Sequence, residues 1–199
     1  SFGGEVVMTS PDHTCGTDRV YEAYQIYTSE LLNSSELQTP SDTVVINIQG
    51  DEPFIQPDQI QALMDCFPTE IATLVHPFTE ENSLNDLQNP NYVKVAVAQE
   101  QVSNNTDVIG RALYFSRSVI PHMRGIDQTD WIKQGQHFRH IGMYAYRADI
   151  LQKITQLPPS PLEKLECLEQ LRWLESGLTI RVALTHHASI GIDTPQDLQ

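Results

Sequence analysis

Apolar residues recur along this chain in two alternating patterns, short β-branched runs and longer stretches with the spacing of a helix. Residues 43–48 (TVVINI) are almost wholly apolar, which is typical of a strand covered on both faces. The alternation of the two patterns predicts an α/β protein built on a sheet. Further strands are predicted at residues 71–75, 93–98, 112–115, 142–146 and 179–184.

Helical spacing fills the segments between these strands and predicts helices at residues 19–32, 57–67, 147–157 and 161–176. Residues 123–138 are polar and have no clear period, which indicates a long loop or excursion that serves as a lid or an interface arm. The chain opens on Gly3-Gly4 and a short apolar run, without a leading strand. Because α/β sheets normally begin with a strand, we expect the sequence to enter the fold part-way.

Composition and charge narrow the class of protein. The 199 residues are 40% hydrophobic, enough for one domain with a core. Twelve Lys and Arg against 26 Asp and Glu give a formal charge of −14, so the surface repels nucleic acid, and an anionic substrate needs a metal ion or well-placed arginines. No apolar run is long enough for membrane insertion. Cys15, Cys66 and Cys167 are far apart, which suits a reducing cytoplasm.

Two aspartates follow predicted strands and are the candidate metal ligands. Asp51, in QGDEP, comes directly after residues 43–48, at the strand end where open parallel sheets bind their ligands. Asp193, in GIDTPQD, follows residues 179–184 and is not explained by the helix start that Thr194 would cap. Two such carboxylates could share one octahedral Mg²⁺ with waters and phosphate oxygens. Each could equally be an ordinary turn residue.

A glycine-bearing loop, HTCGTDR at residues 13–19, opens the first predicted helix. The N-terminus of a helix offers free N–H groups to an anion or to the edge of a base. The simpler interpretation makes Thr17 the helix cap and leaves Arg19 solvated.

The helix predicted at residues 161–176 (PLEKLECLEQLRWLES) has leucines around most of its circumference, which predicts burial. Glu169 falls between Leu165 and Trp173 on one i, i+4 row, so an acid stands in an apolar strip. A buried carboxylate is costly without a partner. An ion pair with Arg172 and a contact with a substrate are both open interpretations.

The segment RHIGMYAYR, residues 139–147, is a predicted strand with polar groups at both ends. A period of two places His140, Gly142, Tyr144 and Tyr146 on one face, and this combination suits a polyhydroxylated ligand. Histidine and tyrosine are otherwise ordinary core or surface residues. Arg117, after LYFS, is a further candidate cation, with a surface salt bridge as the alternative.

Taken together and in this order, the segments resemble the 3-deoxy-manno-octulosonate cytidylyltransferases, also called CMP-Kdo synthetases. The resemblance implies a Rossmann-like nucleotide-diphospho-sugar transferase fold with a mixed sheet, in a single domain over residues 1–199. It also implies transfer of CMP from CTP to the anomeric hydroxyl of 3-deoxy-manno-octulosonate (Kdo), with release of pyrophosphate, for lipopolysaccharide synthesis. The strings that carry it run nearly end to end: GGEVVMT, HTCGTDR, VVINIQGDEP, NPNYVKVAV, ALYFSRSVIP, RHIGMYAYR, SPLEKLECLEQLR and GIDTPQDL.

By motif, Asp51 and Asp193 look like the catalytic Mg²⁺ ligands of the family. An arginine would suit the Kdo carboxylate through its planar fork, and a glutamate would accept hydrogen bonds from sugar hydroxyls. The family also implies a cytoplasmic homodimer, whose interface we expect near residues 116–139. The substrate-binding positions implied by the resemblance are Gly16, Thr17, Arg19, Gln49, Arg117, His140, Tyr144, Glu169 and Gln170.

The sequence departs from the family at its start, because no string of the form PARxxSxRLPGKPL, which grips the triphosphate in the family, occurs. We therefore expect a domain that is truncated at its N-terminus and a polypeptide that alone has little or no transferase activity. Three alternatives remain: a cytidylyltransferase for 8-amino-Kdo or sialic acid, a Mg²⁺-dependent phosphohydrolase that uses the two aspartates, and a non-catalytic remnant that dimerises or binds a partner.

Overall fold

The structure is a computed structural model and describes residues 4–13, 15–31, 39–50, 54–100 and 107–187. Helices and strands alternate along the chain in the way the sequence pattern predicts. The elements are α1 (Gly16–Leu31), β1 (Val44–Asn47), α2 (Pro57–Met64), β2 (Ile71–Pro77), α3 (Leu84–Gln88), β3 (Lys94–Gln99), β4 (Val108–Ser116), the 3-10 helix η1 (Gln128–Asp130), α4 (Trp131–Gln134), β5 (Phe138–Arg147), α5 (Ala148–Ile154), α6 (Pro161–Glu166), α7 (Gln170–Glu175) and β6 (Ile180–Leu184).

The strands form one mixed sheet in the order β1-β5-β2-β6-β4-β3. β2 and β6 run parallel, and the other neighbouring pairs are antiparallel. β3 also pairs with β5, with Lys94 opposite Arg139 and Val95 opposite Phe138, so the far edge of the sheet curls back. The predicted α/β fold with a mixed sheet is confirmed.

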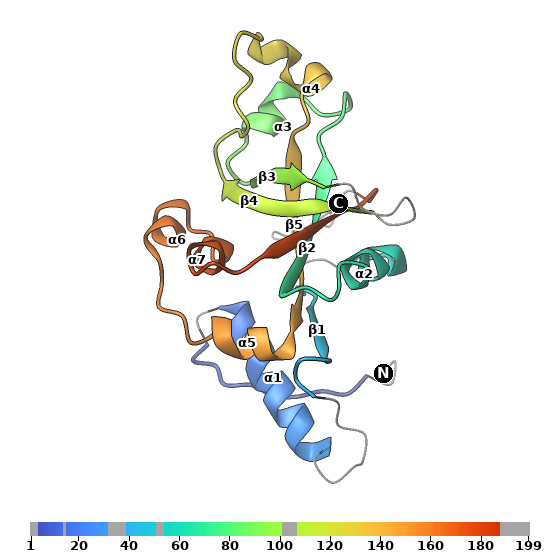
Figure 1. The fold of residues 1–199 in the computed structure, drawn as a ribbon, viewed down its shortest axis with the longest axis vertical. Helices are drawn as coiled ribbons and strands as arrows, with labels where there is room; N and C mark the ends of the chain where they lie inside the picture. Colours follow the sequence, from blue (N-terminus) through green and yellow to red (C-terminus); the bar gives the residue numbers. More distant parts are fainter. Residues whose placement is uncertain (1–3, 14, 32–38, 51–53, 101–106, 188–199) are drawn as a thin grey trace.

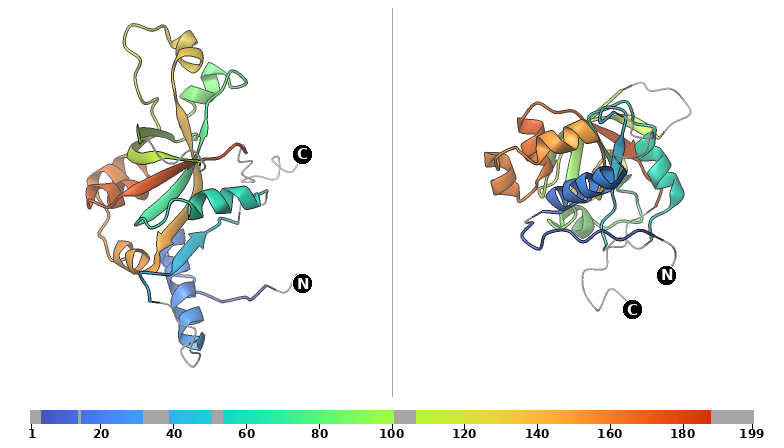
Figure 2. Two further views of the ribbon diagram at one scale, coloured as in Figure 1. Left: turned by 45° about the vertical axis from the view of Figure 1, so that its right-hand side comes forward. Right: turned by 90° about the horizontal axis from the view of Figure 1, so that it is seen from below.

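Each face of the sheet buries a separate cluster, because successive side chains of a strand point to opposite faces. The helices α5 and α7 cover one face, where Tyr144, Tyr146 and Trp173 are buried (Figure 1). The helix α2 covers the opposite face, where Leu63 and Leu74 are fully buried (Figure 2). Both faces are therefore part of the core.

An excursion between β4 and β5 carries η1 and α4, and lies with α3 at one end of the elongated molecule, whereas α1 lies at the other end (Figure 1). A third, smaller cluster of Phe78, Leu87 and Trp131 holds this end together. The segment that the sequence marks as a long polar excursion thus contains two short helical pieces.

The helix predicted at residues 161–176 is wrong as a single element, because the chain breaks between α6 and α7. Cys167 adopts a left-handed conformation with φ of 52°, and it ends α6. The proposed apolar row also fails, since Leu165 is 81% exposed whereas Trp173 is 1% exposed. Glu169 therefore stands at the start of a second, short helix.

The strand predicted at residues 43–48 forms β1, but the expected cover on both faces is wrong. Val44, Val45 and Ile46 are only partly buried, because β1 pairs with β5 alone among the described residues and stands at the edge of the described sheet. No helix in the described ranges is both long and apolar enough to cross a membrane.

Candidate active site

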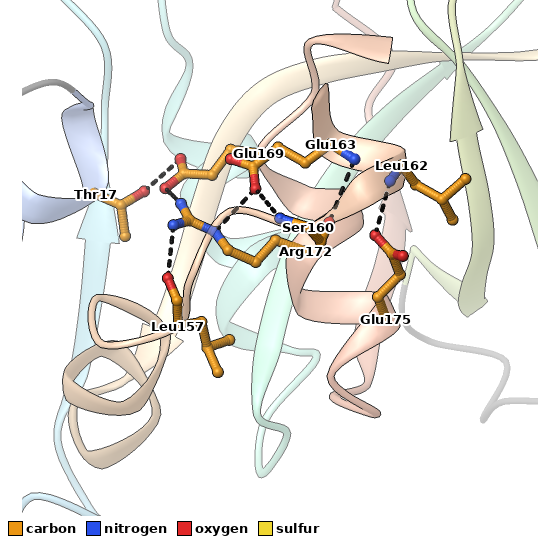
Figure 3. Close-up of polar contacts among 8 residues, drawn as sticks. All are labelled: Thr17, Leu157, Ser160, Leu162, Glu163, Glu169, Arg172 and Glu175. Atoms are coloured by element: carbon orange, nitrogen blue, oxygen red, sulfur yellow. Dashed lines mark hydrogen bonds and ion pairs between the residues drawn. The ribbon is translucent and has the colours of Figure 1, made fainter. Parts of the chain in front are cut away.

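The glycine-bearing loop and the helix α7 meet through one hydrogen bond (Figure 3). Thr17 lies in the first turn of α1, is 3% exposed, and donates its hydroxyl to Glu169 Oε2 at 2.8 Å. The hydroxyl is thus used for a long-range contact, and the interpretation of Thr17 as a simple helix cap is wrong. Two segments 152 residues apart in sequence converge here.

Arg172 holds the other oxygen of the same carboxylate, as Figure 3 shows. Its Nη2 donates to Glu169 Oε1 at 2.8 Å, and its Nη1 donates to the Leu157 carbonyl at 3.0 Å. Its Nε lies 3.4 Å from Glu163 Oε2. Of the two interpretations left open for Glu169, the structure shows the ion pair with Arg172, and this pair coexists with the contact to Thr17.

The face predicted for residues 139–147 also forms. His140 and Tyr144 have ring centroids 5.2 Å apart, and Tyr144 and Tyr146 have centroids 5.8 Å apart, so the three side chains share one face of β5. Trp173 of α7 stands edge-on to both tyrosine rings, at 5.1 and 5.7 Å. The imidazole is held by a 3.0 Å contact between His140 Nε2 and Thr73 Oγ1 of β2.

Burial sets the protonation state of these groups. It lowers the pKa of His140 to about 3, with a smaller effect from the Arg139 charge, so the imidazole is neutral at physiological pH. Burial, and then nearby Glu169, raises the pKa of the Tyr146 phenol. Burial likewise raises the pKa of the Cys15 thiol to about 12, which excludes a cysteine thiolate nucleophile at this position.

Several buried polar atoms in this region have no hydrogen-bond partner among the described residues: Tyr144 Oη, Tyr146 Oη, Trp173 Nε1 and Arg172 Nε. The Tyr146 hydroxyl lies close to Thr17 and Asn47 but is not in hydrogen-bonding geometry with either. An unpartnered buried polar group costs free energy, so these atoms are typical of a site that binds a polar ligand or ordered water.

Gln49 and Gly16 lie beside this cluster. The side-chain amide of Gln49 packs over Gly142 of β5, with its Nε2 3.6 Å from the point where a Cβ would stand. Asn47 Nδ2, at the end of β1, lies 3.9 Å from the point where a Cβ of residue 16 would stand. The structure thus brings Gly16, Thr17, Gln49, His140, Tyr144 and Glu169 into one region, between β5, α7 and the start of α1.

Three other predicted substrate-binding residues, Arg19, Arg117 and Gln170, make no described hydrogen bond to this group of residues. Arg19 is exposed and its Nη1 donates to Thr9 Oγ1 at 2.7 Å and to the Ser10 carbonyl, so it fixes the segment before α1. The Arg117 guanidinium donates to the carbonyls of Glu166, Pro90 and Cys167. Gln170 is 6% exposed at the first position of α7.

Asp51 and Asp193 lie outside the described residues. The described segment that follows Asp51 is nevertheless hydrogen-bonded to the described segment that precedes Asp193. Gln59, near the start of α2, donates its Nε2 to Thr185 Oγ1 at 3.1 Å, just after β6. His187 contacts Asp58 at 2.7 Å, with Nε2 facing Oδ2. No group of three or more metal-ligating side chains occurs within the part of the chain that the structure describes.

Sequence reasoning missed Thr73, Trp173 and the link between Gln59 and Thr185. Thr73 had a signal, because it is a lone hydroxyl in the otherwise apolar run IATLV. Trp173 was assigned only to an apolar row. The Gln59–Thr185 pair is 126 residues apart and had no signal in the sequence.

Comparison with known proteins identifies the family. The sequence model of the cytidylyltransferase family matches residues 1–180. A 3-deoxy-manno-octulosonate cytidylyltransferase of Phocaeicola vulgatus is 50% identical over 201 aligned residues, which cover 100% of this chain and 72% of that protein. Its counterpart in Bacteroides thetaiotaomicron is 48% identical over 100% of this chain and 73% of its own length. The chain belongs to the 3-deoxy-manno-octulosonate cytidylyltransferase family.

A solved structure supports this membership at the level of the fold. The structure of a CMP:2-keto-3-deoxy-manno-octonic acid synthetase complexed with CTP matches with a TM-score of 0.75 and 36% sequence identity. The match covers 99% of this chain and 70% of that one. The fold predicted from the resemblance, that of this transferase family, is confirmed.

Proposed function

We propose that the chain transfers CMP from CTP to the anomeric hydroxyl of Kdo, giving CMP-Kdo and pyrophosphate. Relatives named for this activity align over the whole chain, and the similar solved structure holds CTP. The observation in the structure that carries the proposal is the Thr17–Glu169 hydrogen bond, because it joins the glycine-bearing loop to the acid on α7.

The proposed reaction needs no covalent intermediate with the protein. The anomeric oxygen attacks the α-phosphorus of CTP, the bond to the β-phosphate oxygen breaks, and pyrophosphate leaves. Positioning and electrostatic stabilisation dominate such transfers. Glu169 would accept hydrogen bonds from sugar hydroxyls, while neutral His140 and Tyr144 would orient the sugar acid without adding charge.

Magnesium would be held by Asp51 and Asp193. Two carboxylates are a donor set that suits Mg²⁺ with waters and phosphate oxygens. The Gln59–Thr185 and Asp58–His187 contacts support this assignment, because they join the described residues that flank the two aspartates. When bound, the ion would neutralise negative charge on the phosphate oxygens, which a chain of charge −14 cannot do with its surface.

The test is a pyrophosphate-release assay of the native protein with CTP, Kdo and Mg²⁺, with each component omitted in turn and the product weighed by mass spectrometry. We expect release only when all three are present, and loss of about a thousandfold in turnover for Asp193→Asn. The polypeptide of residues 1–199, assayed in parallel, tests the expectation of low turnover on its own.

The same assay separates the alternatives. A panel of Kdo, 8-amino-Kdo and sialic acid decides which acceptor is used. Phosphate release from CTP without an acceptor would favour a hydrolase and overturn the proposal. Calorimetric titration with CTP, with and without Mg²⁺, should give heat, whereas a non-catalytic remnant should give none.

We further propose that the protein acts as a homodimer in the cytoplasm, where CTP is made. The segment 116–139 is the proposed interface, since it projects at one end of the molecule with its own small cluster around Trp131. Light scattering of the native protein should give twice the mass of one chain, and a monomer at micromolar concentration contradicts this.

A further inference from the structure

Arg172 is the centre of a polar network that sequence reasoning considered only as a neutralising partner. Its side chain is 11% exposed and lies between two carboxylates, Glu163 and Glu169, at 3.4 and 2.8 Å. A third contact runs to the Leu157 carbonyl at 3.0 Å. The guanidinium thus links α7 to the start of α6 and to the turn that follows α5 (Figure 3).

This network fixes the direction of the Glu169 carboxylate. Arg172 occupies Oε1 and Thr17 occupies Oε2, each at 2.8 Å, so the carboxylate plane cannot rotate without breaking a charge-assisted hydrogen bond. Glu169 remains 26% exposed, and each of its oxygens keeps a further lone pair for a ligand. An acid held in this way is pre-organised to accept hydroxyl groups.

Only arginine can make this set of contacts. Its Nη1 and Nη2 donate hydrogen bonds to the Leu157 carbonyl and to Glu169, and its Nε lies 3.4 Å from Glu163 as an ion-pair contact without a hydrogen bond, whereas a lysine offers a single nitrogen on a flexible stem. Glu163 is itself held at the start of α6, where its carboxylate accepts the Ser160 N–H at 2.9 Å. The backbone at the start of α6 therefore fixes the position of the Glu163 carboxylate beside Arg172.

We propose that Arg172 is a positioning residue, which orients Glu169 for the sugar acid and couples sugar-acid binding to the first turn of α1 through Thr17. The inference rests on the proposed function. It makes Arg172 act through Glu169, without touching the substrate.

The test compares steady-state constants of Arg172→Lys with those of the wild type in the native full-length protein. We expect the KM for Kdo to rise about tenfold, while the KM for CTP changes by less than about twofold and kcat by less than about threefold. Thr17→Val should raise the KM for Kdo in the same way, whereas Thr17→Ser, which keeps the hydroxyl, should leave this KM at the wild-type value. The double variant should lose less than the product of the two single losses, because both free the same carboxylate.

The matched control is Glu175→Gln. Glu175 Oε2 accepts the Leu162 N–H at 3.2 Å in the same α6–α7 unit but does not contact Arg172 or Glu169 in Figure 3. We expect it to leave both KM values unchanged. If Arg172→Lys lowers the Tm and leaves the KM for Kdo unchanged, the network is only a stabilising ion pair and the inference is overturned.

Hydrogen exchange gives a readout that does not depend on activity. Arg172→Lys and Thr17→Val should both speed amide exchange in residues 16–20, and Glu175→Gln should not. A wild-type protein that neither binds CTP nor transfers CMP refutes the proposed function alone. Unchanged exchange in α1 of the Arg172→Lys variant refutes the coupling alone.

Discussion

On the face of the sheet under α2, the buried side chains are aliphatic or small, and the buried Gln59 and Thr185 hydrogen-bond to each other. On the face under α5 and α7, which we call the aromatic face, the core combines aliphatic side chains with buried aromatic rings, and it includes buried polar atoms of Tyr144, Tyr146 and Trp173 without partners among the described residues. Since unpartnered polar burial is costly, the first face is built for stability and the second gives up stability beside the candidate site.

The largest effect is expected from a cavity on the aliphatic face. Leu63→Ala removes a fully buried side chain of α2 and should lower the free energy of unfolding by about 3 kcal/mol. If the two faces are functionally separate, the KM for Kdo stays unchanged. Urea denaturation and steady-state kinetics of the same sample check both statements, and a change in KM beyond about twofold would break the comparison.

A substitution at the edge of the aromatic face should lower activity strongly and stability only slightly. Glu169→Gln removes the charge that faces the candidate site, and we expect kcat/KM for Kdo to fall about a hundredfold. Arg172 keeps its contacts with Glu163 and the Leu157 carbonyl, so the free energy of unfolding should fall by only about 1 kcal/mol. Thermal denaturation beside the kinetic assay measures both, and a stability loss without a kinetic loss contradicts the assignment.

Lowering the pH below about 6.5 should reduce the free energy of unfolding through His140 on the aromatic face. Unfolded His140 takes up a proton near pH 6.5, but burial delays protonation of the native imidazole to about pH 3. The unfolded state therefore binds more protons as the pH falls below about 6.5, and stability is lost across this window. We expect His140→Asn to reduce the loss between pH 7 and pH 5 by about 2 kcal/mol, as measured by urea midpoints. An unchanged slope would show that the imidazole is solvated.

The smallest effect is expected from Tyr146→Phe. Because the hydroxyl has no partner among the described residues, its removal should change the free energy of unfolding by less than about 1 kcal/mol, in the stabilising direction. A loss above about 2 kcal/mol would show that in solution the hydroxyl bonds to Thr17 or Asn47, or to water. The matched control is Tyr27→Phe, which removes the same hydroxyl from an exposed residue of α1 and should leave stability unchanged.

Local pattern was sufficient for most of the fold. β-branched runs predicted the strands that became β1 to β6, and helical spacing predicted α1, α2 and α5, each with ends shifted by a few residues. It failed at residues 161–176, since leucine spacing does not reveal the left-handed Cys167 that separates α6 from α7. Arg117 supports this break, because it donates to the carbonyls of Glu166 and Cys167 from a distant strand end.

The sequence by itself determined the family, the alternation of strands and helices, and the shared face of His140, Tyr144 and Tyr146, because all of these depend on motifs or on residues a few positions apart. It offered the pairing of Glu169 with Arg172 as one of two interpretations, and the structure decided in its favour. The assignment of Asp51 and Asp193 to magnesium stays a prediction. Only the tertiary structure decided that Thr17 meets Glu169 and that Gln59 meets Thr185, 152 and 126 residues away. Such contacts arise when the sheet closes and packs its helices, and no local period encodes them.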